Sequence, residues 1–204
     1  MLHAFAGGTQ SKEQRLYEAA KANDLQKARQ LLALSADPNG HVEHVERGVS
    51  SCLHAACQHK LSSKDIVALL LNAKADPSAE DEDGWRPLHW AASINAEDPI
   101  RLLLEHGADP NARTRRGETP LHWAAKNDAA RAVRALAAHP QVDVLARCGR
   151  DQETPLEWAR SFKSAAAEEA LKGATSAAGA AGAAHVATQE RRASKAPPWV
   201  MRLQ

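Results

Sequence analysis

The sequence predicts an all-α fold, a solenoid of about five helix–turn–helix repeats with short hairpin loops and a flexible C-terminal tail. Two motifs recur along the chain every 33 to 39 residues. The first, Leu-His-x-Ala or a variant of it, begins at Leu16, Leu53, Leu88, Leu121 and Leu156. The second, Ala-Asp-Pro-Asn or a variant of it, begins at Ala36, Ala75, Ala108 and Val142. Because one such unit cannot bury its apolar face alone, repeats of this length stack on one another.

The apolar composition favours the same fold class. The chain has 204 residues, of which 43 are alanine, while aromatic residues make up only 4%. Side chains this small fill a single globular core poorly, but they allow short helices to pack closely against their neighbours. Five of the aromatic residues are tryptophans, and three of them, Trp90, Trp123 and Trp158, share one position of the repeat. We expect these three to pack along the first helices.

Each repeat is predicted to contain two helices and an extended exit. Thr119 and Pro120 favour the start of a first helix, because Thr caps helices and the N–H that Pro lacks is not needed there. Leu102 and Leu103 follow the spacing of a second, core-facing helix. Gly107 then ends that helix in a left-handed conformation. The Asp-Pro pair that follows makes the chain extend, since the residue before Pro avoids helical geometry.

At two places the chain resembles the ankyrin repeat family. Residues 117–125 read Gly-Glu-Thr-Pro-Leu-His-Trp-Ala-Ala and are similar to the family signature Gly-x-Thr-Pro-Leu-His-x-Ala-Ala. Residues 100–111 read Ile-Arg-Leu-Leu-Leu-Glu-His-Gly-Ala-Asp-Pro-Asn and resemble its second helix and exit turn. The resemblance covers about residues 12–172. It implies a non-enzymatic scaffold that binds proteins, and it leaves the partner open because one fold serves many partners.

The repeats are not uniform, and their differences predict the ends of the domain. Glu157 and Arg160 stand where other repeats have His and Ala, and polar residues in packing positions are typical of a terminal capping repeat. In the second repeat, Ser51 and Cys52 replace Thr-Pro. We therefore expect an N-terminal extension over 1–11, repeats at about 12–40, 41–80, 81–112, 113–146 and 147–172, and a tail over 173–204.

The tail has a different composition from the repeats. It begins rich in Ala and Gly, and we expect Gly173 and later glycines to interrupt any helix, which predicts a disordered linker. Its end is basic and carries Trp199. Arg191-Arg192-Ala193-Ser194 resembles a site for basophilic kinases, which makes Ser194 a candidate phosphorylation site. An alternative function follows, a regulatory adaptor whose basic, phosphorylated tail is the main signal.

No residues with a catalytic pattern are found, and we predict that the chain is not an enzyme. His54, His89 and His122 share one repeat position, and the family resemblance implies that they hydrogen-bond the adjacent backbone. A second hypothesis is zinc binding by a group of His and Cys residues, His41, His44, Cys52, His54, Cys57 and His59. The Cys-x4-Cys spacing has no second pair to close such a site, and Cys57 stands in an Ala position. We expect neither a metal nor a cofactor.

The resemblance implies that a partner contacts the loop tips and the ends of the first helices. Trp85 follows the acidic loop 81–84, and two interpretations remain open, an exposed binding anchor or a ring folded onto a neighbouring loop. The tip around Glu82 is acidic and the tip around Arg115 is basic, which predicts a bipolar groove. The expected contact residues are Gln58, His59, Glu82, Asp83, Trp85, Ser93, Ile94, Arg115, Arg116, Glu118, Lys126, Asn127, Arg150, Asp151 and Glu153.

Charge and hydropathy restrict the class of partner that the chain can bind. The formal net charge is +1 and the mean hydropathy is −0.48, so neither nucleic acid nor an anionic membrane is favoured as a partner. No apolar run approaches the ~20 residues of a membrane span, and the first residues do not resemble a signal peptide. Three cysteines, an odd number, suit a reducing compartment. We expect a cytoplasmic or nuclear monomer that binds a protein.

Overall fold

The computed structural model describes residues 10–40, 42–44, 48–59, 63–149 and 151–176. The N-terminal extension through residue 9, His41, Arg150 and the tail from residue 177, with Ser194 and Trp199, lie outside the described residues.

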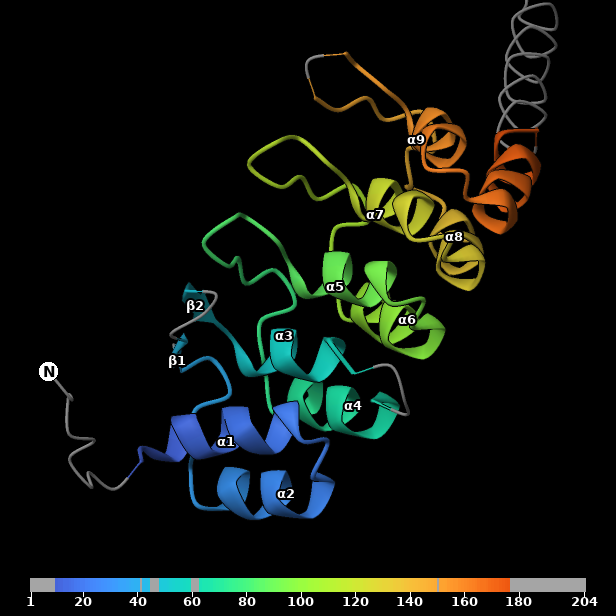
Figure 1. Ribbon diagram of the computed structural model, residues 1–204. Helices are drawn as coiled ribbons and strands as arrows, with labels where there is room; N and C mark the ends of the chain where they lie inside the picture. Colours follow the sequence, from blue (N-terminus) through green and yellow to red (C-terminus); the bar gives the residue numbers. More distant parts are fainter. Residues whose placement is uncertain (1–9, 41, 45–47, 60–62, 150, 177–204) are drawn as a thin grey trace, which may run out of the picture.

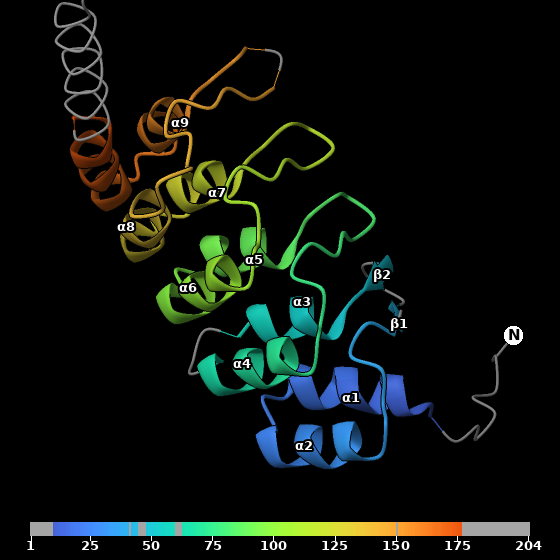
Figure 2. The ribbon, with the colours of Figure 1, turned by 180° about the vertical axis from the view of Figure 1, so that it is seen from behind.

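The described residues form a curved stack of helix pairs in two layers (Figure 1; Figure 2 shows the reverse side). The inner layer contains α1 (Lys12–Lys21), α3 (Cys52–Cys57), α5 (Pro87–Ser93), α7 (Pro120–Lys126) and α9 (Pro155–Ser161). The outer layer contains α2 (Leu25–Ala33), α4 (Lys64–Asn72), α6 (Glu97–Glu105), α8 (Ala130–Ala137) and a helix over 165–176. The prediction of an all-α repeat stack is confirmed.

Loops between the helix pairs project to one side, away from the outer layer (Figure 1). The long loop of the second repeat forms a two-stranded antiparallel ribbon, in which β1 (Val42–His44) pairs with β2 (Gly48–Ser50). The loop before α9 closes with an isolated antiparallel bridge between Cys148 and Glu153. These loops carry the tips that the sequence marked for binding.

Small residues allow the two layers to pack closely. The paired alanines of the first helices are at most 1% exposed, as at Ala91, Ala92, Ala124 and Ala125. Leucines fill the remaining space at each level of the stack, and Leu53, Leu88 and Leu121 are buried in the same way. This arrangement accounts for a chain that is rich in Ala yet poor in aromatic residues.

A buried histidine links most of the first helices to the next loop. The backbone N–H of Thr119 donates to Nδ1 of His122 at 3.1 Å, and that of Arg86 donates to Nδ1 of His89 at 3.0 Å. Nδ1 is therefore the acceptor, and Nε2 carries the proton. Nε2 of His122 donates to the carbonyl of Glu153 at 3.1 Å, in the loop of the following repeat. The structural role implied for these histidines is thus visible in the geometry.

The same bond recurs at the other two positions. Nε2 of His54 lies 3.0 Å from the carbonyl of Trp85, and Nε2 of His89 lies 3.1 Å from the carbonyl of Ala112. Burial lowers the pKa of all three imidazoles, and for His89 to about 4. The three side chains are therefore neutral at pH 7, as the pattern of donors and acceptors requires.

Asparagines connect the exits of successive repeats. Nδ2 of Asn111 donates to the carbonyl of Gln141 at 2.7 Å, and its Oδ1 accepts from the N–H of Asp143. Asn39 makes the same pair of bonds to Lys74 and Asp76. Each side-chain amide thereby satisfies backbone groups one repeat away, where no regular ladder exists to do so.

The last helix of the described residues closes the stack. It runs from 165 to 176 and passes through Gly173, where the sequence was expected to interrupt a helix, so that expectation is wrong. Ala167 and Leu171 are completely buried on this helix, and Oδ1 of Asp128 accepts from the N–H of Ala167 at 2.9 Å. Packing against α8 outweighs the small helix penalty of one glycine.

The buried histidines predict a loss of stability in mild acid. A histidine whose pKa is lower when folded binds protons more readily in the unfolded state, so stability falls as pH drops below about 6.5 and toward about 4. For His89 the full loss is roughly 3 kcal/mol. Urea unfolding of His89→Gln between pH 7.5 and 4.5 should show a flatter pH dependence than the parent chain.

His106→Gln serves as the matched control, because His106 is exposed. It should lower the unfolding free energy at pH 7.5 less than His89→Gln does, because Nδ1 of His106 bonds within its own helix, to the carbonyl of Leu102 at 2.9 Å. Identical pH profiles for His89→Gln and the parent chain would contradict the assignment.

Candidate protein-binding surface

Two neighbouring loops have tips with the same turn geometry. In residues 81–84 the N–H of Gly84 donates to the carbonyl of Asp81 at 2.9 Å, and in residues 114–117 the N–H of Gly117 donates to the carbonyl of Thr114 at 2.8 Å. Both glycines have φ near +80°, the left-handed region that glycine favours. The two central positions of each turn point to solvent as a result.

Those central positions carry opposite charges in the two turns. Glu82 and Asp83 occupy them in the first turn, Arg115 and Arg116 in the second, and all four residues are exposed. The salt bridges found within the described ranges join other residues, such as Arg86 with Glu80 at 2.7 Å. The charges at the two tips are therefore available to a partner.

Backbone contact joins the two tips into one surface. The N–H of Arg115 donates to the carbonyl of Asp83 at 3.1 Å. A Cβ placed on Gly84 would lie only 3.0 Å from the backbone nitrogen of Arg115, so this approach requires a glycine. We call the two turns, 81–84 and 114–117, together with the rings of Trp85 and Trp123, the tip surface.

The ring of Trp85 folds onto the neighbouring repeat. Its centroid lies 4.1 Å from that of Trp123 on α7 and 4.8 Å from that of Trp90 on α5. The backbone of Trp85 is held as well, because Oδ1 of Asp81 accepts its N–H at 2.8 Å. Of the two interpretations left open by the sequence, the geometry supports the folded ring, although Trp85 remains partly exposed.

An aromatic row continues from Trp123 toward the end of the stack. Trp123 and Trp158 meet edge to face at a centroid distance of 6.2 Å, and Trp158 meets Phe162 at 5.8 Å. Nζ of Lys126 lies 4.6 Å above the Trp123 ring and 5.3 Å from the Phe162 ring, within cation–π range. Phe162 is 51% exposed. Together these residues form a row of partly exposed aromatic rings along the inner layer.

A pocket of about 220 Å³ opens between the two tips. Its apolar walls come from Trp85 and Trp123. Charged and polar residues complete its lining, and these are Asp83, Thr114, Arg115, Arg116 and Glu118. The fold thus brings an acidic tip, a basic tip and two tryptophans from successive repeats to one point.

Glu118 does not lie at an exposed tip as expected. It is only 8% exposed, and its Oε2 accepts the Thr114 hydroxyl at 3.0 Å. The Thr114 hydroxyl in turn accepts the backbone N–H of Glu118 at 3.3 Å. The carboxylate therefore braces the turn from inside and borders the pocket.

Two guanidinium groups beside the tips brace the loops. Nη1 of Arg113 donates to the carbonyls of Gly117 and Arg147, at 2.9 and 2.8 Å. Nη1 of Arg147 donates to the carbonyl of Gln152 at 2.7 Å. These arginines add positive charge near the basic tip, while Nη1 of each donates to backbone carbonyls of the chain.

The helix-end residues marked by the sequence are spread along the stack. Oγ of Ser93 donates to the carbonyl of Trp90, and Nδ2 of Asn127 donates to that of Trp123, both at 2.9 Å. Gln58 and Ile94 are half-buried C-caps of α3 and α5. Each of these four residues ends a first helix.

The remaining residues that were expected to contact a partner are not part of the tip surface. Nε2 of His59 is bonded to the carbonyl of Lys21 in the first repeat, at 2.6 Å. Asp151 is exposed, whereas the backbone of Glu153 pairs with Cys148. Arg150 lies outside the described residues.

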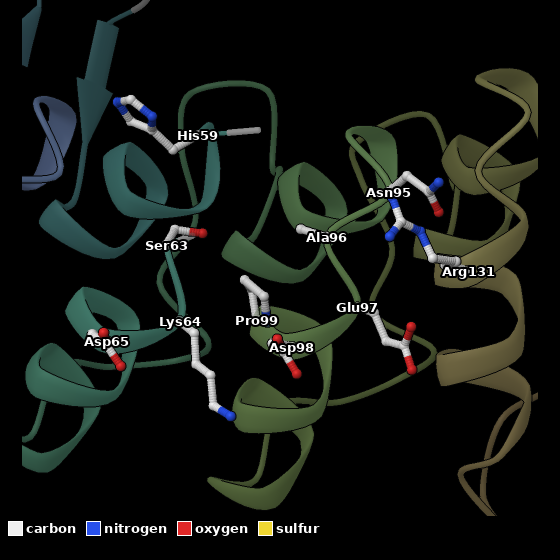
Figure 3. A pocket seen from close by; sticks show the side chains of 10 residues that line it. All are labelled: His59, Ser63, Lys64, Asp65, Asn95, Ala96, Glu97, Asp98, Pro99 and Arg131. Atoms are coloured by element: carbon white, nitrogen blue, oxygen red, sulfur yellow. The ribbon is translucent and has the colours of Figure 1, made fainter. Parts of the chain in front are cut away.

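A second pocket, of about 430 Å³, was not predicted from the sequence (Figure 3). It lies at the turns between first and second helices. The residues that line it come from three repeats, and they are His59, Ser63, Lys64, Asp65, Asn95, Ala96, Glu97, Asp98, Pro99 and Arg131. No motif marks it, because its lining comes from separate segments of the chain and its charged residues are of both signs.

The described side chains of the His and Cys group are not arranged as a metal site. Cys52 and Cys57 are completely buried in the core, and burial raises the pKa of the Cys52 thiol to about 12. His54 and His59 bond to carbonyls of different repeats. Within the part of the chain that is described, no three His, Cys, Asp or Glu residues are grouped to hold a metal. His41 lies outside that part.

Comparison with known families identifies the repeats. A model described as ankyrin repeats (3 copies) matches residues 16–114, and one described as ankyrin repeats (many copies) matches residues 103–159. Together they cover more than two thirds of the chain, which belongs to the ankyrin repeat family. Repeats of this family generally serve as protein–protein interaction modules.

A search of curated proteins finds no match. Across the described segments, no helix is both long and apolar enough to cross a membrane.

The contact between the tips predicts unequal effects of two glycine substitutions. Gly84→Ala and Gly107→Ala both place a side chain at positive φ, but nothing lies within 4 Å of a Cβ at Gly107. We expect Gly107→Ala to lower the unfolding free energy by about 1 kcal/mol. We expect Gly84→Ala to lower it by about 2–3 kcal/mol, because the tips must also separate. Urea unfolding measures both, and equal losses would contradict a close approach at Gly84.

Proposed function

We propose that this chain is a non-enzymatic adaptor that binds a protein partner through the tip surface and the adjoining ends of the first helices. One observation carries the proposal, the pocket between Trp85 and Trp123 that is bordered by tips of opposite charge. Partly exposed tryptophan and arginine are the residues most enriched at the energetic centre of protein interfaces. The proposed contacts centre on Glu82, Asp83, Trp85, Arg115 and Arg116.

The aromatic row extends the proposed interface beyond the pocket. Lys126 presents a cation beside Trp123 on α7, and Phe162 presents an exposed ring one repeat further along. Asn127 is exposed at the end of α7 and Asp151 in the loop before α9, and Ser93 and Ile94 end the helix that carries Trp90. A partner that follows the inner layer would meet all of these in order.

The chemistry of the site supports binding rather than catalysis. The three histidines that a catalytic hypothesis would use are buried and neutral, and both ring nitrogens are hydrogen-bonded to the protein. The cysteines are protonated, since burial raises the pKa of the Cys148 thiol to about 11. We infer a monomeric adaptor in the cytoplasm or nucleus, where such free thiols persist.

A double substitution tests this function. Partners should be recovered on the immobilised parent chain from extracts of its source and identified by mass spectrometry. Trp85→Ala combined with Arg116→Glu removes a pocket wall and reverses one charge, and we expect at least a tenfold loss of those partners.

Arg131→Glu provides the matched control, because Arg131 is exposed at the second pocket. Its partners should match those of the parent chain. If circular dichroism shows that the double variant is folded and it still recovers the same partners, the tip surface is not the binding site.

Deletion of 177–204 tests the alternative in which the tail is the main signal. Unchanged recovery of partners would contradict that alternative.

A further inference from the structure

We propose that the pocket of the tip surface takes one large apolar side chain from an extended partner segment, with a basic residue flanking it on one side and an acidic residue on the other. The basic residue faces Glu82 and Asp83, and the acidic residue faces Arg115 and Arg116. This inference rests on the proposed function and names the chemistry of the partner.

The volume of the pocket fixes how much of a partner can enter. At about 220 Å³ it is smaller than sites for whole small-molecule ligands, which occupy roughly 300–1,000 Å³. It is larger than a cavity of about 150 Å³ that holds a benzene ring. The pocket therefore matches one aromatic or long aliphatic side chain.

The walls of the pocket determine the character of that side chain. The ring centroids of Trp85 and Trp123 lie 4.1 Å apart with their planes inclined by 47°, so the rings leave no gap for a group between them. An incoming side chain must instead lie against the exposed parts of both rings. Contact with two indoles favours an apolar or aromatic group, which gains both burial and ring contacts.

The border of the pocket determines what flanks the anchor. Asp83 borders it on the first tip, and Arg115 and Arg116 border it on the second. None of these side chains is in an ion pair with another residue of the described ranges. Because the same turn positions carry opposite charges in successive repeats, a segment that crosses the pocket passes from one sign to the other.

Rigidity makes this order of charges selective. The tips are joined by the bond from the Arg115 N–H to the Asp83 carbonyl, and the Trp85 carbonyl is held by His54. A partner of uniform charge would meet a repulsive tip on one side, and the loops could not move apart to avoid it without breaking those bonds. Repulsion between like charges excludes wrong partners, so the order of charges contributes more to selectivity than to affinity.

Selection from a peptide library tests the inference directly. A phage library of random nine-residue peptides would be selected on the full chain at low salt. We expect enriched peptides to contain Trp, Phe, Leu or Met between a Lys or Arg and an Asp or Glu. Synthetic copies should bind at least tenfold more weakly when the central residue is Ala or when either flanking charge is reversed.

Charge-reversed chains extend the test without altering the pocket walls. Selection on Arg115→Glu/Arg116→Glu should enrich peptides whose central apolar residue has a basic residue on both sides. Selection on Glu82→Lys/Asp83→Lys should enrich peptides whose central apolar residue has an acidic residue on both sides. Arg131→Glu, at the second pocket, should select the same peptides as the parent chain. These four tip residues are exposed, so their substitution should leave the fold intact.

Three outcomes would overturn the inference. They are no enrichment at all, enriched peptides without a central apolar residue, and a consensus that stays the same on the charge-reversed chains. The proposed function is judged separately, by the natural partners that Trp85→Ala/Arg116→Glu loses. If those partners are lost while the library fails, the tip surface binds a protein by chemistry other than an anchored segment.

Discussion

The position of the loop tips depends on a hydrogen bond from a buried imidazole to a carbonyl of the next loop. His54, His89 and His122 each donate this bond from Nε2, while Nδ1 accepts a backbone N–H at the start of its own helix. These groups are shielded from water, so a bond left unmade would cost about 1–3 kcal/mol. One neutral side chain thereby caps a helix and fixes the loop that follows it.

Three repeats meet at Trp85 because of this arrangement. Its carbonyl accepts a hydrogen bond from His54 of the second repeat, and its ring contacts the tilted ring of Trp123 of the fourth. A single repeat could form neither contact, so the pocket is a property of the stack. The small alanines serve the same end, since closely spaced first helices bring neighbouring tips within hydrogen-bonding distance. Packing and recognition thus place opposite demands on side-chain size, and the chain meets them at adjacent positions of the same first helices, as at Trp123 and Ala124 of α7.

The periodicity of the sequence predicted the stack, and the resemblance to ankyrin repeats implied the role of the histidines, because both depend on a position within the repeat. The opposite charges of the tips follow directly from the residue types there. The direction of the Trp85 ring was not predictable, since it is set by contact with a residue of the next repeat. Glu118 was expected at an exposed tip, but a local hydroxyl, that of Thr114, draws it inward. The helix through Gly173 and the pocket near Arg131 likewise depend on packing between repeats.

The protonation state of the three histidines decides whether these hydrogen bonds hold the loop tips in place. Long-range nitrogen–proton NMR spectra of the imidazoles, recorded from pH 7.5 down to the onset of unfolding, would report both the charge and the position of the proton. We expect His54, His89 and His122 to be neutral, with the proton on Nε2, for as long as the chain stays folded. A proton on Nδ1, or titration near pH 6.5 in the folded chain, would contradict the account.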